Sequence, residues 1–274
     1  MNSLEKKMVD QLKDLKENHF AIGIKAEFEA EGTRLEEALR LKEVITKAGL
    51  DLTIKIGGCE ALKDMYDSRS IGVTRIVGPM IETAYALKKF LACANLAFPE
   101  EERKEVDFLI NVETISTVKN FDEMLKLPNI KELKGVVVGR VDMTGSMGLT
   151  RESINSDEVR NICDEILVKS KAFSKDMECV IGGGVSEASL PFFKQLTAGN
   201  LDKFETRKVL FDAQKVIQSK DADKGILKAV GFELMWLKNK RNFYGMIYKE
   251  DENRIEMLQK RWDKLIEQAG GRYE

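Results

Sequence analysis

Short apolar runs rich in valine and isoleucine alternate along this chain with segments of helical periodicity, and this alternation constrains the fold more than any other feature. The runs predict strands at Ala21–Phe28, Leu52–Ile56, Val73–Val77, Val106–Val112, Gly135–Val138, Glu178–Ile181 and Lys203–Phe211. In the first intervening helix, Thr33 and Glu36 have the spacing of a capping box, and Gly49 ends the segment. Strands that alternate with helices form parallel β/α units. The strand spacing favours an α/β barrel of the TIM (β/α)8 type over a doubly wound sheet.

One strand of an eight-stranded barrel has no obvious counterpart. Residues 4–15 have the pattern of a helix. A second helical pattern fills the C-terminal part, with an apolar face made of Ile255, Leu258, Trp262 and Leu265. We therefore expect a barrel domain with a short N-terminal helix in residues 1–214 and a helical extension in residues 215–274. The extension is expected to pack on the barrel or on a neighbouring subunit.

The composition excludes several classes of function. The chain of 274 residues has a formal net charge of −2, and its basic and acidic residues are mixed throughout, so it has no nucleic-acid footprint. The charged N-terminal sequence is unlike a signal peptide, and no apolar run approaches the roughly 18 residues of a membrane span. The 4 cysteines lack CxxC spacing, which predicts reduced thiols and a cytoplasmic protein. We expect neither a nucleic-acid partner nor a membrane.

Charged residues gather where the predicted strands end. The charged or amide side chains at these ends are Lys25, Glu27, Glu29, Lys55, Arg75, Asn111, Glu113, Arg140, Asp142, Glu205 and Arg207. In a parallel barrel, the carboxyl ends of the strands carry the chemistry. A buried charge is costly unless it is paired or bound to a metal. Structural ion pairs that close the barrel and a working site are both consistent with this pattern.

Glu113 and Asp142 form the sharpest candidate pair because each ends an apolar strand and the two strands are consecutive. Two carboxylates without a nearby histidine or cysteine form a hard-oxygen site, which suits Mg²⁺ or Mn²⁺. Asp142 opens a run of small residues that we expect to be a loop. The backbone N–H groups of this loop would bind an anion, and the hydroxyl of Thr144 or Ser146 would add a further donor.

Four segments resemble the HpcH/HpaI aldolase and citrate lyase β-subunit-like family of the phosphoenolpyruvate/pyruvate barrel superfamily. They are LTIKIGG, VGPMIETAYAL, INVETISTVKNFDEML and VVVGRVDMTGSMG, in the order and spacing of that family from about Ala21 to Phe211. The resemblance begins at the family's second strand, so it implies a TIM-type barrel that lacks or alters the first strand.

The resemblance implies a carbon–carbon lyase that depends on Mg²⁺ or Mn²⁺ and acts through an enolate on a small 2-oxo acid or a hydroxyacyl-CoA. It implies that Glu113 and Asp142 bind the metal. It also implies that the backbone N–H groups around Val141 and Asp142 face the carboxylate of the substrate.

Two departures from the family bear on the chemistry. Lys55 stands where the family has an arginine, so the bidentate fork is absent, and Arg75 or Arg140 would have to compensate. Ala30 stands where the aldolase branch has a histidine. Glu27 or Glu29 would then act as the base.

Three functions remain open from the sequence. The first is the metal-dependent lyase. The second is a barrel with the same metal site and different chemistry on phosphoenolpyruvate or a sugar acid in a biosynthetic pathway. The third is a non-catalytic binding subunit. The apolar segment Phe232–Tyr248 and the family's habit of assembling favour a homo-oligomer.

Overall fold

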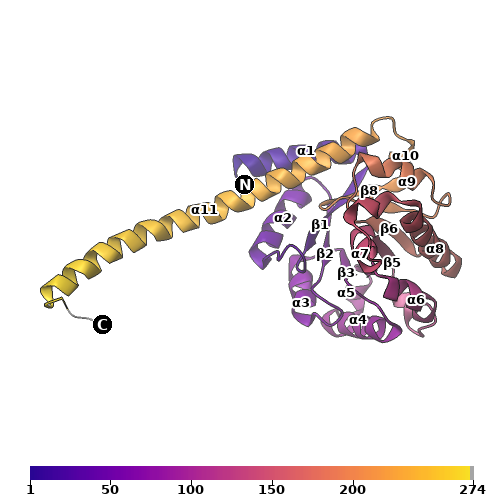
Figure 1. Cartoon of the computed structure of the whole chain (residues 1–274), viewed down its shortest axis with the longest axis horizontal. Helices are drawn as coiled ribbons and strands as arrows, with labels where there is room; N and C mark the ends of the chain where they lie inside the picture. Colours follow the sequence, from indigo (N-terminus) through magenta and orange to yellow (C-terminus); the bar gives the residue numbers. More distant parts are fainter. Residues whose placement is uncertain (272–274) are drawn as a thin grey trace. The chain divides into compact units, whose positions relative to one another are not determined.

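The computed structural model describes residues 1–271 of the chain. These form two compact units, Met1–Glu233 and a helical segment from Leu234 onward. In the first unit, the strands close into a barrel in sequential order, with helices around the outside (Figure 1). The structure therefore confirms the predicted TIM-type barrel with a C-terminal helix.

Eight strands form the barrel: β1 (Ala21–Glu27), β2 (Asp51–Lys55), β3 (Arg75–Gly78), β4 (Asp107–Val112), β5 (Gly135–Gly139), β6 (Glu178–Gly182), β7 (Lys203–Glu205) and β8 (Val209–Asp212). The α-helices are α1 (Ser3–His19), α2 (Leu35–Lys47), α3 (Leu62–Ile71), α4 (Ala84–Ala97), α5 (Glu100–Arg103), α6 (Ile115–Met124), α7 (Arg140–Ser146), α8 (Asp157–Phe173), α9 (Leu190–Lys194), α10 (Ala213–Gln218) and α11 (Ala222–Gln268). None of the helices in residues 1–271 combines the length and the apolar character needed to cross a membrane.

The strand predicted at Lys203–Phe211 is wrong, because this segment is a tight hairpin of β7 and β8. Its turn is stabilised by Thr206, whose Oγ1 accepts a hydrogen bond from the N–H of Val209 at 3.0 Å. β8 pairs antiparallel with β7 on one side and with β1 on the other. An antiparallel strand therefore completes a barrel whose other seven strands are parallel. This altered strand replaces the parallel one that the sequence lacks.

Two local predictions, the start of helix α2 and the loop after β5, differ from the structure. Helix α2 begins one residue later than the predicted cap, because the N–H of Arg34 donates to Glu37 at 3.1 Å. The run of small residues after β5 is not a loop but the short helix α7. There the hydroxyl of Thr144 donates to the carbonyl of Val141 at 2.7 Å, so the side chain serves the helix.

The interior of the barrel is layered. Val77, Leu109, Val137 and Val180 form an apolar cluster in the middle. Towards the amino ends of the strands, Arg75 pairs with Asp107 at 3.1 Å and with Glu178 at 3.0 Å. The apolar layer separates this ionic plug from the charged residues at the carboxyl ends.

A substitution at Gly135 tests how tightly neighbouring strands of the barrel are packed. A Cβ at this position would lie 2.3 Å from the backbone oxygen of Glu178 on the neighbouring strand, which cannot move aside cheaply. We expect Gly135→Ala to lower the free energy of unfolding by about 1–3 kcal/mol, measured by urea denaturation. Gly145→Ala is the matched control, because a Cβ there meets nothing within 4 Å and the residue lies in a helix. The control should be neutral or stabilising by about 0.5–1 kcal/mol. Equal effects of the two substitutions would contradict the packing argument.

Candidate active site

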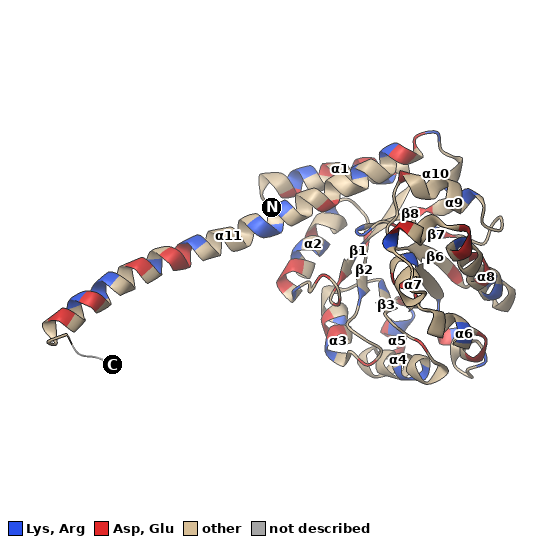
Figure 2. Ribbon diagram, viewed as in Figure 1, with Lys and Arg blue, Asp and Glu red and all other residues tan. Residues whose placement is uncertain are grey.

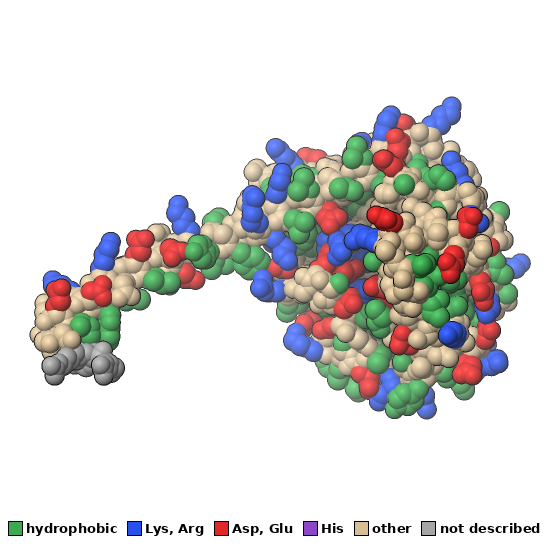
Figure 3. All heavy atoms as spheres, viewed as in Figure 1, with side chains coloured by type: hydrophobic (Ala, Val, Ile, Leu, Met, Phe, Trp, Pro, Cys, Tyr) green, Lys and Arg blue, Asp and Glu red, His purple; other side chains and the backbone are tan. Residues whose placement is uncertain are grey.

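A cavity of about 420 Å³ opens at the carboxyl ends of the barrel strands. The charged residues that line it are Lys25, Glu27, Glu29, Lys55, Glu113, Asp142, Arg151, Glu205, Arg207 and Glu233. On the face shown in Figure 3, acidic and basic side chains adjoin one another over the barrel. The lining has four basic and six acidic residues, so two negative charges are in excess.

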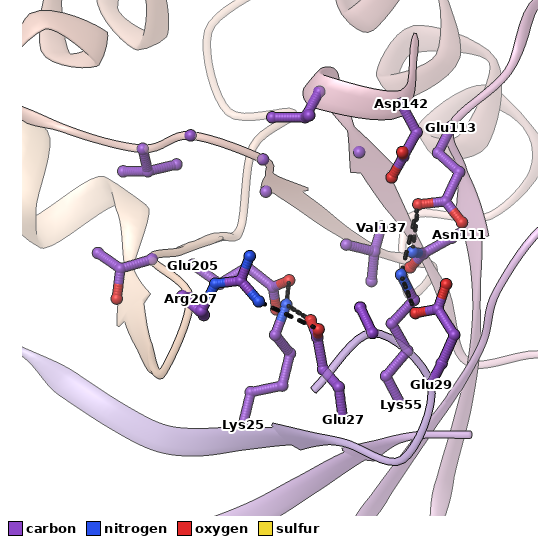
Figure 4. A pocket seen from close by; sticks show the side chains of 18 of the residues that line it. Lys25, Glu27, Glu29, Lys55, Asn111, Glu113, Val137, Asp142, Glu205 and Arg207 are labelled. Atoms are coloured by element: carbon purple, nitrogen blue, oxygen red, sulfur yellow. Dashed lines mark hydrogen bonds and ion pairs between the residues drawn. The ribbon is translucent and has the colours of Figure 1, made fainter. Parts of the chain in front are cut away.

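One half of the cavity is organised by Lys55 at the end of β2. Its Nζ lies 3.0 Å from Glu29 Oε2 and 3.7 Å from Glu113 Oε2 (Figure 4). Glu113 also accepts hydrogen bonds from the N–H of Met80 at 3.0 Å and from Asn111 Nδ2 at 2.6 Å. A Cβ at Gly139 would lie 2.8 Å from Glu113 Oε2, so a glycine is needed at the end of β5 to admit this carboxylate.

Asp142 supplies a second carboxylate beside Glu113. It lies in the first turn of α7 and is exposed to the cavity, and its carboxylate points toward that of Glu113 (Figure 4). Within residues 1–271, the Asp142 side chain has neither a hydrogen bond nor an ion pair. The structure therefore brings together the two residues that the resemblance implies as metal ligands.

Burial raises the pKa of Glu113, and the negative charge of Asp142 raises it further, against the opposing effect of Lys55 and two hydrogen bonds. For Lys55, burial acts to lower the pKa, but Glu113, Glu29 and Glu27 together raise it. Lys55 is therefore a firmly charged cation and not an amine nucleophile. Glu113 is a carboxylate whose negative charge is only partly compensated.

The other half of the cavity is organised by Lys25 at the end of β1. Its Nζ lies 3.0 Å from Glu27 and also forms an ion pair with Glu205. Burial acts to lower the pKa of Lys25, but the neighbouring carboxylates of Glu205 and Glu27 raise this pKa overall. Burial acts to raise the pKa of Glu27, but the positive charges of Lys25, Lys55 and Arg207 lower this pKa overall. Lys25 and Glu27 are therefore both held in their charged forms. The group has one basic and two acidic residues, and Arg207 lies 3.7 Å from Glu27 as a second positive charge.

Arg207 belongs to the turn of the β7–β8 hairpin and is half exposed at the cavity. Its guanidinium approaches Glu27 at 3.7 Å and Glu31 and Glu233 at 3.9 Å, all beyond hydrogen-bond distance. The sequence shows Glu205 and Arg207 as charges at the end of a strand, but it does not select them as site residues. The turn of the hairpin brings Arg207 to the cavity. The prediction of a single strand over this segment did not include that turn.

Three of the predicted site residues lie outside this cavity. Arg75 begins β3 at the opposite end of the barrel and is held by Asp107 and Glu178. Thr144 is buried and bonded within α7. Arg140 is also turned away from the cavity, whereas Val141 and Asp142, which follow it, do line the cavity.

Arg140 is fully buried and bonded to loops behind the cavity. Its guanidinium donates to the carbonyls of Gly182 and Gly183 at 3.2 and 3.0 Å, and to Asn155 Oδ1 at 2.6 Å. It also lies 4.9 Å from the ring centroid of Phe192. Burial lowers the pKa of Arg140 to about 10, and within residues 1–271 no acidic side chain pairs with it. Arg140 therefore holds the loop after β6 and does not replace the missing fork of Lys55.

The donors around Glu113 and Asp142 fit a hard divalent cation. Both are carboxylates, they face each other at the cavity, and the excess of two negative charges in the lining matches the charge of such an ion. Among residues 1–271, no three histidine, cysteine or acidic side chains group as a complete ligand set. A cation would therefore take two ligands from the chain and the others from water or substrate.

The fold is a TIM-type barrel with a charged cavity at the carboxyl ends of its strands. The chain belongs to the HpcH/HpaI aldolase/citrate lyase family, whose sequence model matches residues 34–181, and this match supports an enzyme of the lyase type. The match contains Lys55, Glu113 and Asp142 and excludes Lys25, Glu27, Glu29, Glu205 and Arg207.

Solved structures with the same fold share little sequence with this chain. An HpcH/HpaI aldolase/citrate lyase family protein from Burkholderia cenocepacia J2315 aligns with a TM-score of 0.55 and 13% identity, over 71% of this chain and 89% of that one. Citrate synthase SbnG aligns with a TM-score of 0.57 and 13% identity, over 82% of this chain and 90% of that one. A variant of the same synthase aligns with a TM-score of 0.54 at the same identity and coverage. A search of curated proteins found no match. At this identity, the structural likeness concerns the fold alone.

Arg140→Lys tests the structural role of this arginine. Lysine cannot reproduce the several directed hydrogen bonds, so we expect the free energy of unfolding to fall by on the order of 2–4 kcal/mol. Arg151→Lys is the matched control on the exposed rim and should change stability by less than about 0.5 kcal/mol. If Arg140→Lys were as stable as the control, the assignment of Arg140 to the loop scaffold would be wrong.

Glu113→Gln tests whether the partly compensated negative charge of Glu113 destabilises the folded protein. Because the pKa of Glu113 is raised in the folded state, its charged form destabilises the metal-free protein at neutral pH. We expect the variant to have a higher Tm than the wild type at pH 8. The difference should shrink as the pH falls through the raised pKa, and it should vanish below the ordinary value of the carboxyl group.

Glu205→Gln is the matched control for this experiment, because it removes a carboxylate that compensates Lys25. It should lower the Tm, because the buried ion pair between Lys25 and Glu205 is lost while Lys25 keeps its pair with Glu27. A lower Tm for Glu113→Gln at pH 8 would contradict the assignment of its charge as a destabilising one.

Proposed function

We propose that this protein is a divalent-metal-dependent carbon–carbon lyase that cleaves a small 2-oxo acid by way of an enolate. The observation that carries the proposal is the pair Glu113 and Asp142, two facing carboxylates at the ends of β4 and β5 inside the part of the chain that matches the family. Mg²⁺ or Mn²⁺ held by this pair would polarise the 2-oxo carbonyl and lower the energy of the enolate.

The chain's own groups then bind the substrate and move the proton. Lys55 lies beside Glu113 with a raised pKa, so it offers a permanent positive charge to the developing enolate oxygen. The backbone N–H groups of Val141 and Asp142, at the start of α7, would face the carboxylate of the substrate. These roles do not need the arginine that the family has in place of Lys55.

Glu29 is the proposed base. It lines the cavity next to Lys55, and its side chain is 29% exposed, so a substrate hydroxyl can reach it. Glu27 is less suited, because its lowered pKa makes it a weak proton acceptor. In the cleavage, Glu29 takes the proton of the hydroxyl as the carbon–carbon bond breaks. The bonding electron pair passes to the enolate, and an aldehyde or ketone forms at the hydroxyl carbon.

The size of the cavity and the position of Arg207 favour a small acid over a hydroxyacyl-CoA, which remains the alternative substrate class. A volume of about 420 Å³ suits a compact ligand. Arg207 has three acidic neighbours but no short contact to any of them, so its guanidinium is placed to hold a second acidic group of the substrate.

A second candidate keeps the metal site but changes the reaction to chemistry on phosphoenolpyruvate or a sugar acid. It is favoured by Ala30, which lines the cavity where the aldolase branch has its histidine, and by the charged group around Lys25, which lies outside the family match. A non-catalytic binding subunit is less favoured, because Asp142 is not used in an ion pair that closes the cavity.

Calorimetric titration with Mn²⁺ tests the metal site. We expect Glu113→Ala and Asp142→Ala each to abolish measurable binding, because only two protein ligands hold the ion. Glu233→Ala removes an acidic residue of the same cavity that faces Arg207, so it should bind Mn²⁺ as the wild type does. Undiminished affinity in both ligand variants would contradict the proposal.

The same proteins distinguish the two reactions. With Mn²⁺ bound, the lyase proposal expects decarboxylation of oxaloacetate, which passes through the same enolate, and a loss of roughly 10²-fold or more in kcat for Asp142→Ala. Metal binding without oxaloacetate turnover would favour the second candidate.

A further inference from the structure

Helix α11 carries a long apolar stripe on its C-terminal part. The stripe follows alternating steps of three and four residues and consists of Leu234, Leu237, Arg241, Tyr244, Tyr248, Asp251, Ile255, Leu258, Trp262 and Leu265. Eight of these ten side chains are apolar or aromatic. Leu234, Leu237, Ile255 and Leu258 are each 51–59% exposed, a large fraction for aliphatic side chains that recur at this spacing.

A repeat of this kind is typical of a helix that packs against another helix. Steps of three and four residues keep one seam facing a partner over many turns, as in a two-stranded coiled coil. Lysine, arginine and acidic residues occupy much of the rest of the helix surface (Figure 2), while hydrophobic side chains recur along the segment (Figure 3). The stripe is too long and too regular to be scattered surface apolar residues.

The stripe is complementary to itself when a second copy runs in the opposite direction. If the two-fold axis passes at the level of Met246, Leu234 lies opposite Leu258 of the partner subunit, and Leu237 lies opposite Ile255 of the partner subunit. Tyr244 then faces Tyr248 of the partner subunit. From Leu234 to Leu258, the apolar positions are thus placed on either side of Met246 in matching order.

The two charged residues of the stripe select this direction. In the antiparallel register, Arg241 faces Asp251 of the partner subunit, so each charge in the seam meets its opposite. In a parallel pair, Arg241 would face Arg241 of the partner subunit and Asp251 would face its own copy, which places like charges in the seam. Such juxtaposition costs several kcal/mol, whereas opposite charges also determine the register.

The flanking positions agree in part with the same register. Lys238 would face Glu252 of the partner subunit, and Ile247 would meet its own copy near the axis. Lys240 and Arg254 of the partner subunit are like-charged, but at the edge of the seam, where water screens their repulsion. The symmetric pairing therefore satisfies the stripe from Leu234 to Leu258 and most of its flanks.

We propose that the part of the stripe from Leu234 to Leu258 binds the same part of the stripe in a second copy of this chain, as an antiparallel two-stranded coiled coil with its two-fold axis at Met246. The surface is isologous, so the assembly closes as a dimer at this contact. This interaction does not depend on the reaction proposed for the barrel.

The oligomeric state of the full chain tests the pairing. We expect sedimentation velocity at roughly 1–100 µM to show a dimer for the wild type and a loss of this contact in Leu258→Asp. Met257→Asp is the matched control, because Met257 is 63% exposed one residue away but lies off the stripe. Circular dichroism checks that both variants keep their helix content. A monomeric wild type, or assembly unchanged by Leu258→Asp, would overturn the proposal.

A charge exchange tests the direction. In the antiparallel register, Arg241→Asp and Asp251→Arg each place like charges opposite one another, so each should raise the dimer Kd by roughly tenfold to a hundredfold. The double variant restores opposite charges in every layer and should return to the wild-type Kd. Failure of the double variant to recover would overturn the antiparallel register. Binding of a monomeric wild type to anionic lipid vesicles would instead assign the stripe to a membrane surface.

Discussion

Closure of the barrel by an antiparallel strand is the constraint on which the rest of the barrel unit depends. A parallel sheet of seven strands would leave β1 and β7 with unpaired edges, and β8 pairs with both. Closure directs the carboxyl ends of the strands toward one cavity. The connection from β7 to β8 is only a tight turn, so Arg207 is held at the rim where a parallel strand would have needed a long crossover.

The charges in this cavity differ in how well they are compensated. Lys25 lies between Glu27 and Glu205, and Arg207 lies 3.7 Å from Glu27 as a second positive charge. Glu113 shares Lys55 with Glu29 and faces the unpaired Asp142, so negative charge remains in excess on this side. Lys25, Glu27 and Glu205 lie outside the family match, whereas Lys55, Glu113 and Asp142 lie inside it.

The predictions that succeeded were those that depend on local pattern. Six of the seven predicted strands lie within two residues of their observed bounds, because buried strands are short apolar runs with clear ends. The prediction for Lys203–Phe211 failed, because the turn within this segment lacks the glycine, asparagine or proline that usually marks a hairpin turn. Glu113 and Asp142 were brought together as expected, since the carboxyl ends of adjacent parallel strands meet at one edge.

The sequence by itself determined the class of fold, the resemblance to the family and which residue types stand at the strand ends. These depend on periodicity and on neighbours along the chain. Only the tertiary structure decided the direction of each charged side chain. Arg140 and Asp142 are two residues apart, yet one bonds to the loop after β6 and the other faces the cavity. The reason is that α7 begins at Arg140, and a helix turns its successive side chains to different sides by about 100° per residue.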